Sequence, residues 1–127
     1  MSDMRTPMRR VRGLGAAREG TGHFWFLRVS GVALLFLSLF AIGVVFALTG
    51  KNFDEARVIL AHPIITVGLV LFVALAAEHM RQGMLESIHD YIHGDLLKVA
   101  VVMLNTFFCL LVGAVGVFAL LRISFGG

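Results

Sequence analysis

Residues 64–94 read IITVGLVLFVALAAEHMRQGMLESIHDYIHG, and this stretch decides the fold. Its first part, residues 64–77, is uncharged but shorter than a membrane-spanning helix, which needs about 20 residues. The helix must therefore continue past His79 to about Met84 or Leu85. This length argument places an ionisable imidazole inside the membrane, where such side chains are costly and usually carry a function.

Two more apolar stretches flank this segment, at residues 29–49 and 99–121. Neither contains a charged side chain, and each is long enough to cross a bilayer. The chain lacks the alternating strands of a closed β-barrel, so helices are the remaining way to satisfy the backbone in lipid. In the third stretch, Gly113 and Gly116 permit close helix contact. We therefore predict an all-α membrane protein with three transmembrane helices, over about residues 27–49, 62–86 and 97–121.

The composition excludes a soluble globular domain. Of 127 residues, 58% are hydrophobic and 15% are charged, which is more apolar side chain than a soluble domain of this size can hide. The single cysteine, Cys109, implies no disulfide framework. The sequence also lacks a phosphate-binding glycine loop, paired catalytic carboxylates and zinc-ligand spacing. We therefore expect a chain that does not make or break substrate bonds by itself.

The connections between the spans carry ordinary helix signals. Gly50 is suited to end the first helix, and Pro63 is suited to open the second, where its missing N–H is harmless. Residues 53–62 mix acidic and apolar side chains with helical spacing. Asp54 is a candidate cap for a short interfacial helix there. Residues 90–98 are expected to form a polar connection before the third span.

Basic side chains are concentrated at one end of the predicted bundle. Residues 1–22 form a basic arm, and residues 23–127 form the anchor domain. One side of the membrane then holds eight basic residues and the other holds three: Arg5, Arg9, Arg10, Arg12, Arg18, Arg28, Arg81 and Lys98, against Lys51, Arg57 and Arg122. The positive-inside rule predicts a cytoplasmic N-terminus and a periplasmic C-terminus. The charge thus bears on topology, and no nucleic-acid partner is expected.

His79 has two interpretations. It can hydrogen-bond a neighbouring helix or reach towards the interface, or it can serve as an axial ligand of a haem. Gly83 lies one turn further on the same helix face, and the apolar surroundings would keep water off a porphyrin. No other histidine of the chain can face His79 across a macrocycle. A second axial ligand would therefore come from another polypeptide.

The residues near His79 also have a structural and a functional interpretation. Asp90 can cap a helix and Tyr91 can belong to an aromatic belt. Alternatively, the Tyr91 hydroxyl donates a hydrogen bond to a quinone carbonyl, while Asp90 holds the local network. Arg28 lies at the membrane level of His79 and is either a positive-inside anchor or a partner of a haem propionate. Arg81 has the same two interpretations.

These motifs resemble a known family. The spacing His-x3-Gly-x6-Asp-Tyr starts at His79, and residues 90–94 are similar to an Asp-Tyr-Val-His-Gly run. Residues 20–28, Gly-Thr-Gly-His-Phe-Trp-Phe-Leu-Arg, resemble the start of the family's first span. The family is the small hydrophobic membrane anchor, the D subunit, of succinate dehydrogenase (respiratory complex II). Residues 80–82 depart from it, because Met-Arg-Gln replaces side chains that are often more aromatic.

The resemblance implies a role for each of these residues. His79 would bind haem b, Tyr91 would contact ubiquinone with Asp90 beside it, and Arg28 would lie near the haem propionates. The chain would form half of a two-subunit anchor bundle and contribute to the quinone site without holding the succinate-oxidising centre. Its partners would be a second anchor (the C subunit), an iron–sulfur subunit, a flavoprotein subunit and membrane lipid.

The sequence also favours a cellular location and leaves two alternative functions open. The bacterial cytoplasmic membrane is favoured over the mitochondrial inner membrane, although the arginine-rich start also resembles a transit peptide. One rival is the anchor of a quinol:fumarate reductase, which runs in the reverse direction. The other is a haem-free helical membrane protein, such as a small transporter subunit or an assembly factor. A reduced-minus-oxidised optical spectrum separates the haem-binding and haem-free alternatives.

Overall fold

The computed structural model describes Met4, residues 6–13 and residues 20–126 of the chain. Within these residues every regular element is a helix, as predicted. Arg5 and Arg18 of the expected basic arm lie outside the described residues. The helices are α1 (Pro7–Val11), α2 (Gly20–Leu48), α3 (Phe53–Leu60), α4 (Pro63–Tyr91) and α5 (Asp95–Ser124).

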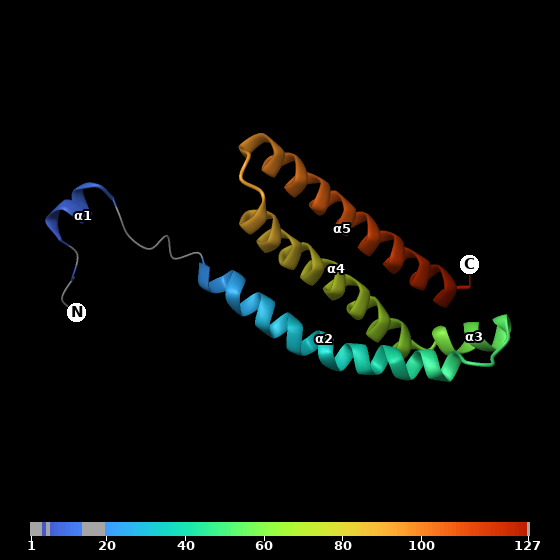
Figure 1. Ribbon diagram of the computed structural model, residues 1–127. Helices are drawn as coiled ribbons and strands as arrows, with labels where there is room; N and C mark the ends of the chain where they lie inside the picture. The colour runs from blue at the N-terminus through green and yellow to red at the C-terminus, as the bar shows by residue number, and fades with distance from the viewer. Residues whose placement is uncertain (1–3, 5, 14–19, 127) are drawn as a thin grey trace.

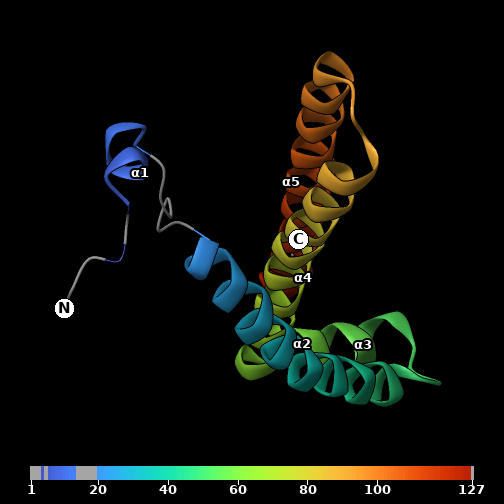
Figure 2. The same ribbon diagram turned by 60° about the vertical axis from the view of Figure 1, so that its left-hand side comes forward.

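The three long helices form one layer, with α4 in the middle (Figures 1 and 2). Helix α4 packs against both α2 and α5, and in the described residues α2 and α5 have no close backbone contact with each other. Figure 2 shows α2 diverging from α4 towards its N-terminal end, whereas α4 and α5 run side by side. Both broad faces of α4 are therefore open to lipid or to another protein.

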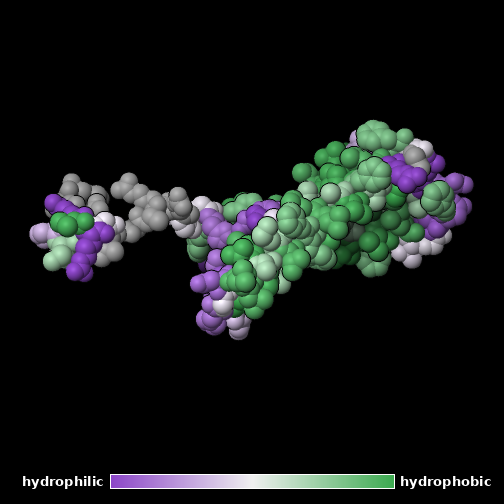
Figure 3. Space-filling model, turned by 90° about the horizontal axis from the view of Figure 1, so that it is seen from above, coloured by the Kyte–Doolittle hydropathy of each residue, from purple (hydrophilic) through white to green (hydrophobic). Residues whose placement is uncertain are grey.

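The length and apolar composition of α2, α4 and α5 are sufficient for three membrane crossings. Their most apolar segments are only 6%, 11% and 17% buried within the chain. Figure 3 shows the result, a hydrophobic surface along the bundle with hydrophilic residues gathered towards its ends. So much exposed apolar side chain is stable only when lipid or partner helices cover it.

Local sequence signals fix most helix ends. Gly50 has a φ of 74°, a backbone conformation suited to glycine, directly after α2. Helix α3 begins with a capping box in which Asn52 Oδ1 accepts from the Glu55 N–H at 2.9 Å. The expected cap at Asp54 is therefore wrong, because Asn52 precedes it with the favoured side-chain geometry. Pro63 opens α4 as predicted, with His62 as its N-cap.

The connection between α4 and α5 is shorter than expected. Helix α4 continues to Tyr91 and α5 begins at Asp95, so residues 92–94 alone form the turn. Asp90 thus belongs to the last helical turn and not to a loop. Ile88, which is 5% exposed, packs this turn, and its carbonyl accepts from the Ile92 N–H at 3.0 Å.

The α4–α5 contact depends on small residues, as the glycine pattern predicted. A Cβ atom added at Gly113 would lie 3.1 Å from Ala77 Cβ, and one at Gly116 would lie 2.7 Å from Val73 Cγ1. The two helices therefore approach to the limit that glycine allows. An unforeseen equivalent joins α2 to α4, where a Cβ at Gly68 would meet the Phe40 ring at 2.5 Å.

Candidate functional site

His79 lies on α4 and reaches across to α2. Its Nδ1 is 2.8 Å from the Ser30 hydroxyl oxygen, and Ser30 is 3% exposed. A Cβ added at neighbouring Gly31 would lie 3.6 Å from His79 Cε1, so the backbone of α2 passes close to the ring. The imidazole thus packs against two small residues of α2, Ser30 and Gly31.

The hydrogen bonds of Ser30 favour one tautomer of His79. The Ser30 hydroxyl can donate to the Leu27 carbonyl oxygen, 3.2 Å away, which uses its single hydrogen. The same oxygen can then only accept from His79 Nδ1–H, which leaves Nε2 unprotonated. In the described part of the chain Nε2 has no hydrogen-bond partner, so its lone pair is available to a metal ion.

Gly83 lies one turn beyond His79, on the side of α4 that faces outward. It is exposed, and a Cβ atom added there would meet nothing within 4 Å. Among the described residues, no group of three or more histidine, cysteine or acidic side chains gathers to hold a metal ion. A metal at His79 would therefore draw further ligands from outside the described residues, as the iron of a haem does.

The two candidate arginines lie at similar depth but in different environments. Since Ser30 pairs with His79 and the helices are antiparallel, Arg28 and Arg81 each lie two residues nearer the arm end of the bundle. Arg28 is exposed and its guanidinium stacks over the Phe24 ring, 4.4 Å from the centroid. Arg28 therefore has no acidic partner among the described residues, whereas Arg81 is paired with Glu78.

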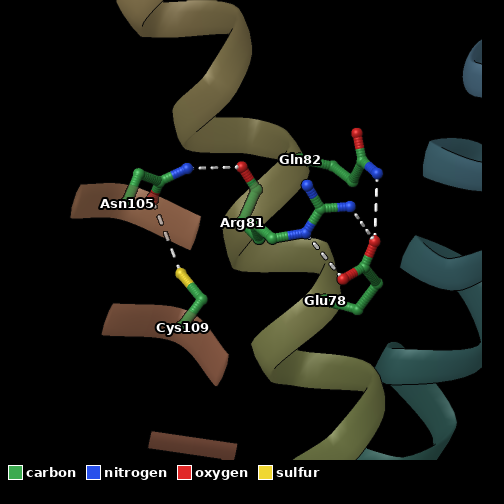
Figure 4. Close-up of polar contacts among 5 residues, drawn as sticks. All are labelled: Glu78, Arg81, Gln82, Asn105 and Cys109. Carbon is green, nitrogen blue, oxygen red and sulfur yellow. Dashed lines mark hydrogen bonds and ion pairs between the residues drawn. The ribbon is translucent and has the colours of Figure 1, made fainter. Parts of the chain in front are cut away.

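Arg81 belongs to a polar cluster that joins α4 to α5 (Figure 4). Its Nε donates to Glu78 Oε2 at 2.8 Å, its Nη2 donates to Glu78 Oε1, and Gln82 donates to Oε1 at 3.0 Å. From α5, Asn105 Nδ2 donates to the Arg81 carbonyl oxygen at 3.0 Å, and the Cys109 thiol contacts Asn105 Oδ1. The sequence did not indicate this cluster, which depends on the packing of two helices.

Asp90 and Tyr91 occupy the last turn of α4, at the arm end of the bundle. Asp90 lines a hollow of about 460 Å³ together with His23, Glu86 and His89. Tyr91 does not line that hollow, and its side chain is exposed, at 83%. The structure thus brings Asp90, but not Tyr91, into a recess formed by this chain.

A contact between α2 and α4 was missed by the sequence reasoning. His23 Nε2 lies 2.9 Å from Glu86 Oε1, across 63 positions of sequence. A second hollow, of about 410 Å³, shares this pair and is also lined by Arg28. The His23–Glu86 pair therefore stands between the recess at Asp90 and the recess at Arg28. The sequence signal that could have indicated this contact was the position of His23 shortly before an apolar span.

Comparison with known proteins identifies the family. The family model for the succinate dehydrogenase/fumarate reductase transmembrane subunit matches residues 2–119. The chain belongs to this family. Within it, the chain is 33% identical over 121 residues to the succinate dehydrogenase hydrophobic membrane anchor subunit of Paracoccus denitrificans, covering 95% of this chain and 93% of the relative. The resemblance expected from the motif at His79 is thereby confirmed.

Other members of the succinate dehydrogenase/fumarate reductase transmembrane subunit family agree. The succinate dehydrogenase hydrophobic membrane anchor subunit of Rickettsia conorii is 29% identical over 111 residues, with 85% of this chain and 86% of the relative covered. No solved structure matches the chain significantly. The chain is thus a succinate dehydrogenase membrane anchor subunit, a multi-pass membrane protein with three spanning helices.

Proposed function

We propose that this anchor subunit supplies an axial ligand to haem b and part of a ubiquinone-reducing site. The observation that carries the proposal is the geometry at His79. A buried serine orients the ring, and Nε2 has no partner among the described residues. Metal-ligating histidines commonly donate their other ring N–H to such a second group, which fixes the tautomer and the orientation of the ring.

The residues around His79 fit a haem. Nε2 offers the lone pair, and the open space at Gly83 leaves room for a flat group beside the helix. Arg28, which has no acidic partner in the described part of the chain, offers a cation at the same depth for a propionate. A bound haem supplies one-electron redox chemistry. The chain contributes the ligand, its orientation and the charge, while a second anchor subunit would contribute the other axial ligand, with Arg81 a further candidate for a propionate.

The proposed quinone site lies at the arm end of α4. Tyr91 there presents a phenol that can donate to a quinone carbonyl without bringing a full charge into an apolar pocket. Its exposure means that the pocket would be completed by the second anchor and the iron–sulfur subunit. Asp90, one residue earlier in the recess beside Glu86, would hold the local network and pass protons from the cytoplasm.

The proposed assembly also contains the flavoprotein subunit, which would oxidise succinate and pass electrons through the iron–sulfur subunit to the quinone. The bacterial inner membrane is the proposed location. The likeness to the anchor of Paracoccus denitrificans, a bacterium, supports it.

Purification of the intact complex from its native membrane tests these proposals. We expect the chain to copurify with a second anchor, an iron–sulfur subunit and a flavoprotein, and the reduced-minus-oxidised spectrum to show a b-type haem. Succinate should reduce ubiquinone in the same preparation. A complete complex without a haem band would contradict the role of His79. Faster quinol-driven fumarate reduction would favour the fumarate reductase alternative.

A further inference from the structure

The Glu78–Arg81–Gln82 cluster lies on an open face of α4. At roughly 100° per residue, Gln82 lies about 60° from His79 around the helix, Glu78 about 100° and Arg81 about 160°, so Arg81 points away from the side that meets α2. Figure 4 shows them over α4, with α5 on one side and α2 on the other. The side chains of Glu78 and Arg81 remain 37% and 25% exposed. A charged pair is thus presented to whatever covers this face of the bundle.

The depth of the cluster corresponds to the head-group boundary. Arg81 is level with Arg28, through the Ser30–His79 hydrogen bond. Trp25 lies one turn nearer the arm end and is 59% exposed, as side chains of an interfacial aromatic belt are. The Glu78–Arg81 pair therefore lies just inside the membrane surface and not at its centre.

A groove leads from this pair into the hydrocarbon region. It has a volume of about 330 Å³ and lies between α4 and α5. Glu78 and Arg81 line its polar end, and Ala74, Ala114 and Val117 line its apolar end. The groove extends over roughly 10 Å of helix axis, at 1.5 Å per residue. Its chemistry changes from ionic to apolar along its length, as that of an amphiphile does.

The hydrogen-bonding capacity of the pair is not exhausted. Arginine has five N–H donors, and Arg81 uses two of them on Glu78. A carboxylate has about four acceptor positions, and Glu78 receives three hydrogen bonds. Donors thus remain at Arg81 and an acceptor position remains at Glu78. The pair as a whole is neutral and presents both signs of charge side by side.

We propose that the α4–α5 groove binds a zwitterionic phospholipid with a primary amine, such as phosphatidylethanolamine. The lipid phosphate accepts from Arg81, the ammonium donates to Glu78, and one acyl chain lies along Ala74 and Ala114. A phospholipid whose head group is purely anionic would bring its charge against the Glu78 carboxylate without offering a donor of equal strength. The groove therefore selects for the amine as well as for the phosphate.

The test uses the purified complex and three variants. Complex in mild detergent is exchanged into equal mixtures of phosphatidylethanolamine and phosphatidylglycerol with identical acyl chains, and retained lipids are counted by native mass spectrometry. Ala114→Leu fills the groove and should remove one tightly held phosphatidylethanolamine. Ala119→Leu makes the same change at an exposed position of α5 outside the groove and should retain it.

Glu78→Gln tests the selectivity for the amine. Removing the carboxylate charge should lower the preference for phosphatidylethanolamine over phosphatidylglycerol by about tenfold, the effect of one charge-assisted hydrogen bond. Equal retention in the Ala114→Leu and Ala119→Leu complexes would overturn the proposal, as would a wild-type complex without head-group preference. Loss of the second anchor from Ala114→Leu, with the lipid count unchanged, would show that the groove binds a protein instead.

Discussion

At the residue scale, the arrangement of Ser30 and His79 explains how a histidine is tolerated within the membrane. Its Nδ1 is satisfied by a hydroxyl that is itself anchored to the backbone at Leu27. An unsatisfied polar group in hydrocarbon costs several kcal/mol. The remaining Nε2 has no such partner in the described residues, so the proposed iron bond would satisfy it.

Substitution at His79 and Ser30 should have graded effects on haem. His79→Leu should abolish the b-type spectrum while the chain stays inserted, because it removes the ligand and keeps an apolar helix. Ser30→Ala should weaken haem retention by about 10–100-fold, because it removes the hydrogen-bond partner that orients the ligating histidine. The haem-to-protein ratio and the reduced-minus-oxidised spectrum measure both effects.

His93→Ala is the matched control, because His93 lies in the turn between α4 and α5 and is exposed. It should keep a wild-type spectrum. If His79→Leu kept one too, the axial ligand would have to be sought elsewhere in the complex.

Tyr91→Phe should separate a quinone contact from a structural role. The substitution keeps the ring and removes its only donor, and a lost hydrogen bond of about 1.4 kcal/mol corresponds to a tenfold effect. We expect ubiquinone reduction to fall roughly tenfold or more. Succinate oxidation with an artificial acceptor should be unchanged, because that chemistry belongs to the partner subunits. A parallel fall in both activities would indicate a defect of assembly, and no fall in either would remove Tyr91 from the site.

At the element scale, close packing determines how α4 meets its neighbours. Small residues at Gly113 and Gly116 allow α5 to lie against Ala77 and Val73. That contact positions Asn105 beside the Arg81 carbonyl. At the other end of the bundle, the Thr66 and Ser124 hydroxyls lie 2.9 Å apart, and both donate to the Leu60 carbonyl oxygen. These contacts fix the register of α4 and α5 at both ends.

Gly116→Ala should loosen this helix pair. The added Cβ would lie 2.7 Å from Val73 Cγ1, so the Val73 side chain or one of the helices must shift, at a cost of about 1–3 kcal/mol for overpacking. We expect a lower midpoint of thermal unfolding for the complex, measured by light scattering or by haem release. Gly43→Ala on α2 is the control, since a Cβ there meets nothing within 4 Å. Equal midpoints for the two variants would contradict close packing at Gly116.

At the scale of the whole molecule, a single layer of three helices is incomplete by itself. Most of each apolar helix faces outward. The candidate functional features also lie on the surface of the layer: the exposed side chains of Tyr91 and Arg28, and the free space beside Gly83. Lipid or partner helices must therefore cover these outward surfaces. This outward exposure supports the proposal that the chain is one part of a larger anchor.

The charge distribution over the whole chain predicts the membrane orientation. Basic residues are concentrated at the arm end, so the N-terminus should be cytoplasmic and, after three spans, the C-terminus should be periplasmic. Alkaline phosphatase fused after residue 127 should be active, and a cytoplasm-dependent fluorescent protein at that position should be dark. The reverse pattern would invert the orientation and place Tyr91 on the periplasmic side.

The sequence by itself determined the number and the type of the membrane-spanning helices. Apolar length decides membrane crossing, because lipid offers the backbone no other hydrogen-bond partner, and this information is local in the chain. Pro63 and Gly50 marked helix ends for the same local reason, since each acts through its own backbone conformation. The position of His79 within a span also followed from length alone.

Only the tertiary structure decided which side chains meet. Ser30 and His79 are 49 positions apart, and His23 and Glu86 are 63 positions apart, so each pairing depends on how α2 crosses α4. Neither the crossing nor the rotation of each helix is encoded in its apolar length, because α2 and α4 are hydrophobic nearly all round. Close contacts between small residues and aromatic rings, such as Gly68 with Phe40, set those angles through steric fit.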